Sequence, residues 1–271
     1  MVLRPSSEPK ILSCLIKLKA QGLSDSSLES ISDKLMHIAR NVDIDRTDDV
    51  NTFISTKSSI EYKSSLTKTY SYYVQAYGLS WNKPKYKPKM GIPRPPTTEQ
   101  VKELIAGASK KYAPIFKLMS EVGASPIEVS IMDESSFDYE RKLVYIKGMK
   151  GHLDRLVPIN DEIMALMKLY FTEYQRFPSN VMMGKKFRKY RDLLAKKLKD
   201  KALRNVRLYD LRHYFGTMTY YRTKDILYTK DVMGHRKLET TLIYTKLIAY
   251  GDEQYICRIA KTLEEASQLI E

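Results

Sequence analysis

The sequence Gly-His-Arg-Lys-Leu-Glu-Thr-Thr-Leu-Ile-Tyr occupies residues 234–244. His235 precedes Tyr244 by nine residues, and a pair of threonines lies between them. A single tyrosine among the 20 in this chain is ordinarily a packed or a surface ring. The spacing to His235 distinguishes Tyr244 from the other tyrosines. A second stretch upstream has to be considered together with this one.

The second stretch is Tyr-Asp-Leu-Arg-His-Tyr-Phe-Gly-Thr at residues 209–217, which predicts a helix carrying Arg212 among largely apolar and aromatic neighbours. Together the two stretches resemble the catalytic boxes of the tyrosine recombinase (phage integrase) family, which breaks and rejoins DNA through a 3′-phosphotyrosine. The tyrosine that opens the second stretch, together with Gly-Ala-Ser-Pro-Ile-Glu-Val at 123–129, looks more like archaeal viral or plasmid integrases than bacterial ones. The resemblance implies a reaction without a metal or another cofactor.

The composition favours a nucleic-acid partner. The 271 residues include 46 Lys and Arg against 32 Asp and Glu, a formal charge of +14, and this surplus favours nucleic acid or an anionic membrane surface. No apolar run could span a membrane, and the N-terminus lacks a signal-peptide core. Cys14 and Cys257 are far apart, outside any CxxC pair, and the four histidines offer no zinc spacing. We therefore expect a cytoplasmic, DNA-associated protein.

A proline-rich segment divides the chain. Residues 82–96 contain five prolines, five basic residues and no acidic residue. Repeated proline is excluded from helix and sheet interiors, so we predict an extended linker over 83–96 between domains at 1–82 and 97–271. One interpretation is a plain spacer. The basic residues favour a linker that also follows a DNA phosphate backbone, through Lys83, Lys85, Lys87, Lys89 and Arg94.

The part before the linker reads as about four short helices. The second begins near Ser24, the third covers 48–54, and the fourth covers 62–77 and stops at Gly78. The first is predicted to carry one apolar stripe, formed by Ile11, Leu12, Leu15, Ile16 and Leu18. The resemblance implies a DNA-holding core-binding domain, and a helical bundle without assigned purpose is the alternative.

The part after the linker is predicted to be α+β and mostly helical. Thr97 and Gln100 form a capping box for a helix ending near Ser109, a second helix covers 112–122, and a third starts at Pro126. Strand patterns around residues 143–145 and 156–159 flank a turn-rich tip at 148–152, which predicts a small antiparallel hairpin. Helical periodicity follows from residue 161 onward.

The resemblance implies a role for each catalytic residue. Tyr244 is the nucleophile, Arg212 holds the non-bridging phosphate oxygens with a bidentate fork, and His235 donates to the same phosphate. The family places a general-acid lysine at the hairpin tip. Lys150 is preferred over its competitor Lys147, because Lys147 falls within the strand pattern. His213, beside Arg212, is interpreted as structural.

Two positions depart from the family pattern. In Gly-Ala-Ser-Pro-Ile-Glu-Val at 123–129, Ser125 stands where the family has its first arginine, and Glu128 matches the acid that orients the active-site cations. Tyr209 replaces the first histidine and can still donate a hydrogen bond. Losing one charged donor to the transition state costs roughly 3–4 kcal/mol, or about 10²–10³ in rate. The sequence therefore predicts an impaired recombinase, either by nature or by deliberate substitution of residue 125.

Two further segments bear on partners. Residues 185–207 carry eleven basic and two acidic residues, which indicates either a solvated helix face or a surface for DNA phosphates. The DNA-binding interpretation assigns contacts to Lys185, Lys186, Arg188 and Lys189. The amphipathic tail at 252–271 docks on a neighbouring protomer, as the resemblance implies, or packs on its own domain.

These features together predict a site-specific recombinase that clamps double-stranded DNA. The resemblance implies a homo-tetramer on DNA and a monomer or dimer when free. A non-catalytic DNA-binding accessory protein or regulator, derived from a recombinase, is the alternative. A membrane-surface protein is disfavoured because the positive charge is spread along the chain, not confined to one amphipathic helix.

Overall fold

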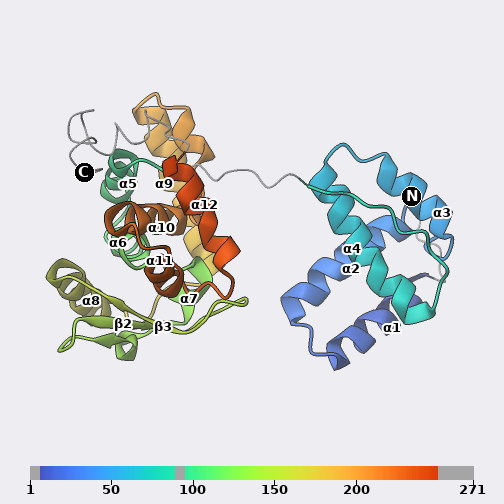
Figure 1. Cartoon of the computed structure of the whole chain (residues 1–271), viewed down its shortest axis with the longest axis horizontal. Helices are drawn as coiled ribbons and strands as arrows, with labels where there is room; N and C mark the ends of the chain where they lie inside the picture. Colours follow the sequence, from blue (N-terminus) through green and yellow to red (C-terminus); the bar gives the residue numbers. More distant parts are fainter. Residues whose placement is uncertain (1–6, 89–94, 250–271) are drawn as a thin grey trace. The chain divides into compact units, whose positions relative to one another are not determined.

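The chain divides into two compact units, Met1–Gly91 and Ile92–Glu271 (Figure 1). The computed structural model describes residues 7–88 and 95–249. The boundary between the units falls inside the segment 83–96, where the sequence predicts a linker. The predicted tail at 252–271 lies outside the described residues.

The first unit is a bundle of four helices, as the sequence predicts: α1 (Ser7–Ala20), α2 (Asp25–Ala39), α3 (Thr47–Ser55) and α4 (Ile60–Tyr77). Local signals set the ends of α4. The side chain of Ser59 accepts a hydrogen bond from the backbone N–H of Tyr62 at the start, and Gly78 adopts a left-handed φ of 62° at the end. The predicted stop at Gly78 is confirmed.

The apolar face of α1 differs from the predicted stripe. Ile11, Cys14 and Leu18 are buried, whereas Leu12 and Ile16 are 60% and 62% exposed. Residues spaced by three, four and seven positions share one face of a helix. Positions 12 and 16 lie off the face that contains 11, 14 and 18, so their assignment to the stripe was wrong.

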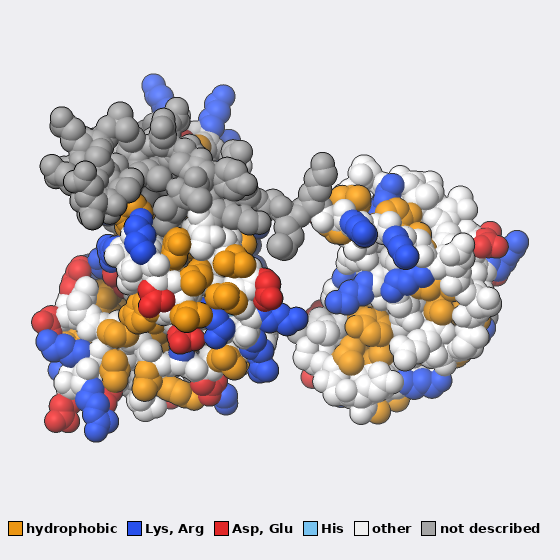
Figure 2. Space-filling model, viewed as in Figure 1, with side chains coloured by type: hydrophobic (Ala, Val, Ile, Leu, Met, Phe, Trp, Pro, Cys, Tyr) orange, Lys and Arg blue, Asp and Glu red, His pale blue; other side chains and the backbone are white. Residues whose placement is uncertain are grey.

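The segment after α4 forms neither helix nor strand over residues 79–88 and lies partly against the first unit. The indole N–H of Trp81 donates to Asn51 Oδ1 at 2.8 Å, and its ring meets Tyr70 edge-on at 5.0 Å. Tyr86 packs against the same core. Lys and Arg side chains also gather on one face of this unit (Figure 2).

The second unit combines helices with one small sheet, which confirms the predicted α+β class. Three strands pair in the antiparallel order β1-β2-β3, from β1 (Phe137–Asp138), β2 (Leu143–Ile146) and β3 (Arg155–Pro158). The predicted hairpin is β2–β3, and β1 was not predicted. The helices are α5 (Thr98–Ala106), α6 (Ala113–Val122), α7 (Pro126–Ile131), α8 (Asp161–Glu173), α9 (Asn180–Lys197), α10 (Asp210–Thr223), α11 (Ile226–Met233) and α12 (Leu238–Ala249), with short 3₁₀ turns at Glu134–Ser136 and Ala202–Asn205.

The core of the second unit centres on α6, whose apolar side chains Ile115, Phe116, Leu118, Met119 and Val122 are all fully buried. The helix α10 packs against α6 on one side and against α12 on the other. The hairpin β2–β3 reaches from the sheet toward α12 (Figure 1). This arrangement brings three separate chain segments to one place. No helix of the described residues is long and apolar enough to cross a membrane.

Candidate active site

A cavity of about 310 Å³ lies where the hairpin tip, the start of α10 and the segment leading into α12 meet. Four of the predicted catalytic residues line it: Lys150, Tyr209, His235 and Tyr244. The other lining residues are Gly151, His152, His213, Arg236, Lys237, Thr240 and Ile243. The fold therefore gathers residues that are widely separated in the sequence around one hollow.

Tyr244 on α12 lines this cavity with only 1% of its surface exposed. Its ring lies nearly parallel to that of His235, with 6.4 Å between centroids and 8° between planes. Its Oη is 3.3 Å from Nδ1 of His213. Burial raises the pKa of Tyr244 well above its ordinary value of 10, while the charge of Arg212 opposes that rise. The phenol is therefore neutral in this arrangement.

Arg212 is fully buried near the start of α10. One Nη atom donates to the carbonyl of Gly123 at 2.6 Å, and the other donates to the carbonyl of Met233. Its nearest carboxylate oxygen is Oε2 of Glu128, at 3.5 Å. Burial lowers the pKa of this guanidinium. Because both Nη atoms are held by backbone carbonyls, the guanidinium is fixed in place.

His235 follows Gly234, the left-handed residue that ends α11 at a φ of 65°. Its Nδ1 lies 2.9 Å from Oγ1 of Thr241. Burial, assisted by the charge of Arg212, lowers its pKa to about 3. The imidazole is therefore neutral at physiological pH and can act as a hydrogen-bond donor, not as a charge.

Ser125 and Glu128 lie at the start of α7. The backbone N–H of Ser125 donates to Oε2 of Glu128 at 2.7 Å. Ser125 is 3% exposed, and its hydroxyl has no hydrogen-bond partner among the described residues. Burial alone would raise the pKa of Glu128. Hydrogen bonds from His152 and Arg155, with the charges of Arg155 and Arg212, outweigh burial and hold that pKa far below its usual range.

Two residues of this cluster, His152 and Arg155, were not predicted from the sequence. His152 Nδ1 lies 2.8 Å from Oε1 of Glu128, and Arg155 contacts both oxygens of the same carboxylate. One sequence signal does point to Arg155. It shares the inward register of β3 with Val157, and a charged residue on the buried side of a strand requires a partner.

The hairpin tip carries Lys150 in a left-handed conformation, with a φ of 53°, followed by Gly151 at 90°. Two hydrogen bonds join the hairpin tip to the segment that carries His235. The N–H of Leu153 donates to the carbonyl of Gly234 at 2.8 Å, and Nε of Arg236 donates to the carbonyl of Gly151 at 2.9 Å. Lys147 directly follows the last residue of β2 and is not among the residues that line the cavity. Of these two lysines, only Lys150 lines the cavity.

The predicted DNA-contacting residues that the structure describes do not line the cavity. Lys83, Lys85 and Lys87 are exposed, while Lys89 and Arg94 lie outside the described residues. On α9, Met183 and Phe187 face the core. Lys185, Arg188 and Lys189 are exposed, and Lys186 is half-buried.

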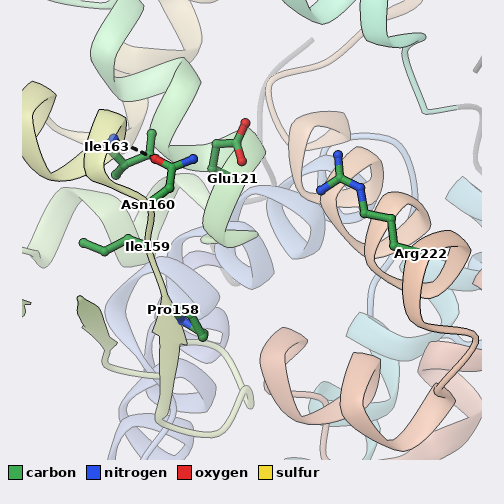
Figure 3. Close-up of a pocket in the computed structure, with 6 residues that line it drawn as sticks. All are labelled: Glu121, Pro158, Ile159, Asn160, Ile163 and Arg222. Carbon is green, nitrogen blue, oxygen red and sulfur yellow. Dashed lines mark hydrogen bonds between the residues drawn. The ribbon is translucent and has the colours of Figure 1, made fainter. Parts of the chain in front are cut away.

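A second cavity, of about 350 Å³, lies elsewhere in this unit (Figure 3). It is lined by Glu121, Pro158, Ile159, Asn160, Ile163 and Arg222. Asn160 caps α8, with its Oδ1 accepting from the N–H of Ile163 at 2.9 Å. None of the predicted catalytic residues lines this cavity. Over the described residues, no cluster of three or more His, Cys, Asp or Glu side chains could hold a metal ion.

Comparison with known proteins identifies the class to which this fold and site belong. Residues 97–249, more than half of the chain, match the phage integrase family. The chain belongs to that family, which confirms the resemblance found in the sequence.

The similar proteins include archaeal recombinases. The tyrosine recombinase XerA of Thermococcus onnurineus is 31% identical over 176 residues, which cover 61% of this chain and 62% of that relative. The XerA of Pyrococcus horikoshii is 28% identical over 187 residues, which cover 65% of each. The chain therefore spans less than two thirds of the length of these relatives.

Solved structures share the fold. A lambda integrase dimer bound to a COC′ core site matches with a TM-score of 0.69 at 10% identity, covering 87% of this chain and 76% of that one. The XerH recombinase bound to its difH substrate matches with a TM-score of 0.60 at 16% identity, covering 93% and 91%.

Proposed function

We propose that this protein is a site-specific DNA recombinase or integrase that cleaves and rejoins double-stranded DNA through a 3′-phosphotyrosine at Tyr244. The observation that carries this proposal is the meeting of Tyr244, His235 and Lys150 around one cavity, with Arg212 near enough to oppose the rise in the pKa of Tyr244. The family membership and the tyrosine recombinases among the relatives support it.

The chemistry follows from the positions of these groups. Oη of Tyr244 attacks the scissile phosphorus, the bond from phosphorus to O5′ breaks, and the departing O5′ takes a proton from Lys150. Arg212 and His235 stabilise the charge on the non-bridging oxygens. In the second step a 5′-hydroxyl attacks the phosphotyrosine and releases Tyr244.

His213 is placed to take the proton of the nucleophile. Its Nδ1 is 3.3 Å from Oη of Tyr244, and burial lowers its pKa, so the imidazole is neutral and able to accept a proton. This proposal gives His213 a role beyond the structural one inferred from the sequence. Because Tyr244 is only 1% exposed, attack also requires its ring to turn toward the cavity.

Double-stranded DNA is the proposed partner. The exposed basic residues of 83–87 and of α9, with the formal charge of +14, support a two-domain clamp that holds DNA mainly through its phosphates. The first unit serves as the core-binding domain and the second as the catalytic domain. A homo-tetramer on DNA is part of the same proposal, and it predicts a shift from monomer or dimer when the duplex is added.

A second candidate function is a DNA-binding accessory protein or regulator without catalysis. The observation that favours it is Ser125, which offers no charge at the position of the first family arginine. How far the cleavage rate falls as a result depends on whether another cation contacts the scissile phosphate.

One experiment separates the two candidates. A duplex site is first selected from random sequences with the full chain, and a nicked version of this site is then incubated with the protein. The recombinase should become covalently attached to the DNA strand, and the Tyr244→Phe variant should not. Tight binding without attachment would favour the regulator.

A further inference from the structure

Three ionised side chains are packed together beside His152, which lines the cavity. Glu128 and Arg212 are fully buried, and Arg155 is 7% exposed. All three surround the start of α7, where the carbonyl of Gly123 accepts hydrogen bonds from both guanidinium groups, at 2.6 Å from Arg212 and 3.4 Å from Arg155. Buried charges at this spacing interact strongly because water does not screen them.

The two arginines do not share the carboxylate equally. Arg155 binds Glu128 with a two-pronged contact, Nη1 to Oε1 at 3.1 Å and Nη2 to Oε2 at 3.2 Å. Arg212 approaches only to 3.5 Å and directs its Nη atoms at backbone carbonyls. The parallel fork is the stronger arrangement, so Arg155 is the main partner of Glu128, and Arg212 shares the same carboxylate only through a longer contact.

Unsatisfied polar atoms gather at the same place. The described residues include five buried side-chain polar atoms without a hydrogen-bond partner, and three of these are Oγ of Ser125, Nε of Arg155 and Nε of Arg212. Buried donors are nearly always satisfied in folded proteins. Several unsatisfied donors beside two guanidinium groups that share one carboxylate indicate a site arranged for an anion.

The fold itself directs Arg155 to this position. Arg155 pairs with Ile146 at the end of the hairpin next to the tip, in the inward register. A Cβ added to Gly234 would stand 3.0 Å from Nη1 of Arg155 and 2.7 Å from the carbonyl oxygen of Leu153. Gly234 therefore leaves room for the guanidinium of Arg155 beside His235.

We propose that Arg155 compensates electrostatically for the arginine missing at position 125. By neutralising Glu128, it leaves the charge of Arg212 free for the scissile phosphate. Arg155 acts in this scheme as a positioning residue, through Glu128 and Arg212. The inference rests on the proposed function, because the phosphate in question is the one that Tyr244 attacks.

The test changes the charge of the buried cluster stepwise in the full chain. Arg155→Gln removes the cation while its amide can still donate to Glu128, so Glu128 is left to neutralise Arg212. Cleavage of the nicked duplex should then fall by about 10²–10³, the usual effect of losing one charged donor. In the double variant Glu128→Gln/Arg155→Gln no carboxylate offsets the charge of Arg212, and cleavage should return to within about tenfold of the unsubstituted rate.

A second substrate distinguishes charge compensation from a structural role. A methylphosphonate at the scissile position carries no negative charge, so its cleavage needs one cation fewer. Arg155→Gln should therefore lose far more activity on the phosphodiester than on the methylphosphonate. A merely structural defect would lower both rates alike. Arg222→Gln, which removes an exposed arginine from the far end of α10, should leave the ratio of the two rates unchanged.

The outcomes are separable. If Arg155→Gln cleaves the phosphodiester at the unsubstituted rate, or loses both substrates equally, the inference is wrong while the proposed function stands. If Arg155→Gln does not fold, the double variant decides: binding of the duplex without cleavage overturns the inference. If the unsubstituted chain forms no covalent product, or if Tyr244→Phe still forms one, the proposed function fails and the inference fails with it.

Discussion

The ring of Tyr244 lies directly against the backbone of Gly216. A Cβ added to Gly216 would stand 2.4 Å from Cζ and 2.8 Å from Oη of Tyr244, and the three nearest atoms all belong to that side chain. Gly216 lies within α10 and Tyr244 within α12. The proposed nucleophile therefore occupies a position that only the absence of a side chain on the neighbouring helix leaves open.

This contact predicts the effect of Gly216→Ala. The added methyl group clashes with a buried ring, so the free energy of unfolding of the second unit should fall by about 1–3 kcal/mol. In a Tyr244→Ala background the same change should instead raise it by up to about 1 kcal/mol, because alanine is the better helix former. Urea unfolding followed by circular dichroism measures both effects. The same loss in both backgrounds would contradict the contact.

Tyr244→Phe should abolish covalent attachment to DNA and leave duplex binding nearly unchanged, because only the hydroxyl is removed. The lost contact with His213 should cost at most about 1 kcal/mol of stability. Gel detection of the protein–DNA product and anisotropy of a labelled duplex give the two readouts. Attachment that persists in this variant would show that another residue is the nucleophile.

His235 should make the second unit sensitive to mild acid. Its pKa is lowered from 6.5 to about 3 in the folded chain, so the unfolded chain binds more protons between these values. Stability therefore falls as the pH falls through this window, by about 1–2 kcal/mol between pH 7 and pH 5 from this residue. The lowered pKa of His213 acts in the same direction. In His235→Gln this part of the pH dependence should disappear.

The single tryptophan provides the control for that measurement. Trp81 packs on the first unit, so its fluorescence reports the unfolding of that unit, while circular dichroism includes the second. His235→Gln should leave the fluorescence transition unchanged at both pH values. If His235→Gln changed only the fluorescence transition, the acid sensitivity would belong to the first unit, which would contradict the prediction.

Ser125→Arg tests the sequence-based prediction of impairment directly. If only the missing arginine at position 125 limits the reaction, Ser125→Arg should raise the cleavage rate by about 10²–10³. If Arg155 already neutralises Glu128, the gain should stay below about tenfold in the unsubstituted chain and be larger in Arg155→Gln. Single-turnover cleavage of the nicked duplex measures both. A large gain in the unsubstituted chain would show that the site lacks a cation.

Duplex affinity should fall steeply with salt, because counterions are released when lysines bind phosphates. Replacing the four linker lysines by glutamine should weaken binding to the selected site and to random duplexes alike and should reduce the salt slope. These residues are Lys83, Lys85, Lys87 and Lys89. The matched control replaces four exposed lysines outside the predicted DNA-binding segments, Lys102, Lys110, Lys142 and Lys168. Equal losses in both sets would show that the linker has no special part in binding.

The features that could be predicted from the sequence are those that depend only on residues close together along the chain. Gly78 ends α4 because its left-handed conformation is local, and the Thr97–Gln100 capping box starts α5 for the same reason. The assignment of Leu12 and Ile16 to the apolar stripe of α1 was wrong because packing within the four-helix bundle, not the sequence of one helix, determines which face is buried.

The centre of the site needed information that no short stretch contains. Glu128 and Arg155 are 27 residues apart, and their contact depends on the register of β3 against β2 and on the packing of the sheet beside α7. Gly216 and Tyr244 meet only because α10 and α12 pack together. The family resemblance assigned roles along the chain, but it could not indicate which additional side chains enter the same space.

The two backbone-anchored contacts between the hairpin and the segment after α11 restrict how this protein can be altered. Leu153 donates a hydrogen bond to Gly234, and Arg236 donates one to Gly151. The stretches 147–155 and 233–237 therefore have to be exchanged together. A chimaera that receives only one of the two stretches from another member of the family would separate the tip lysine from His235. Exchanges intended to change DNA site preference should therefore carry both stretches together.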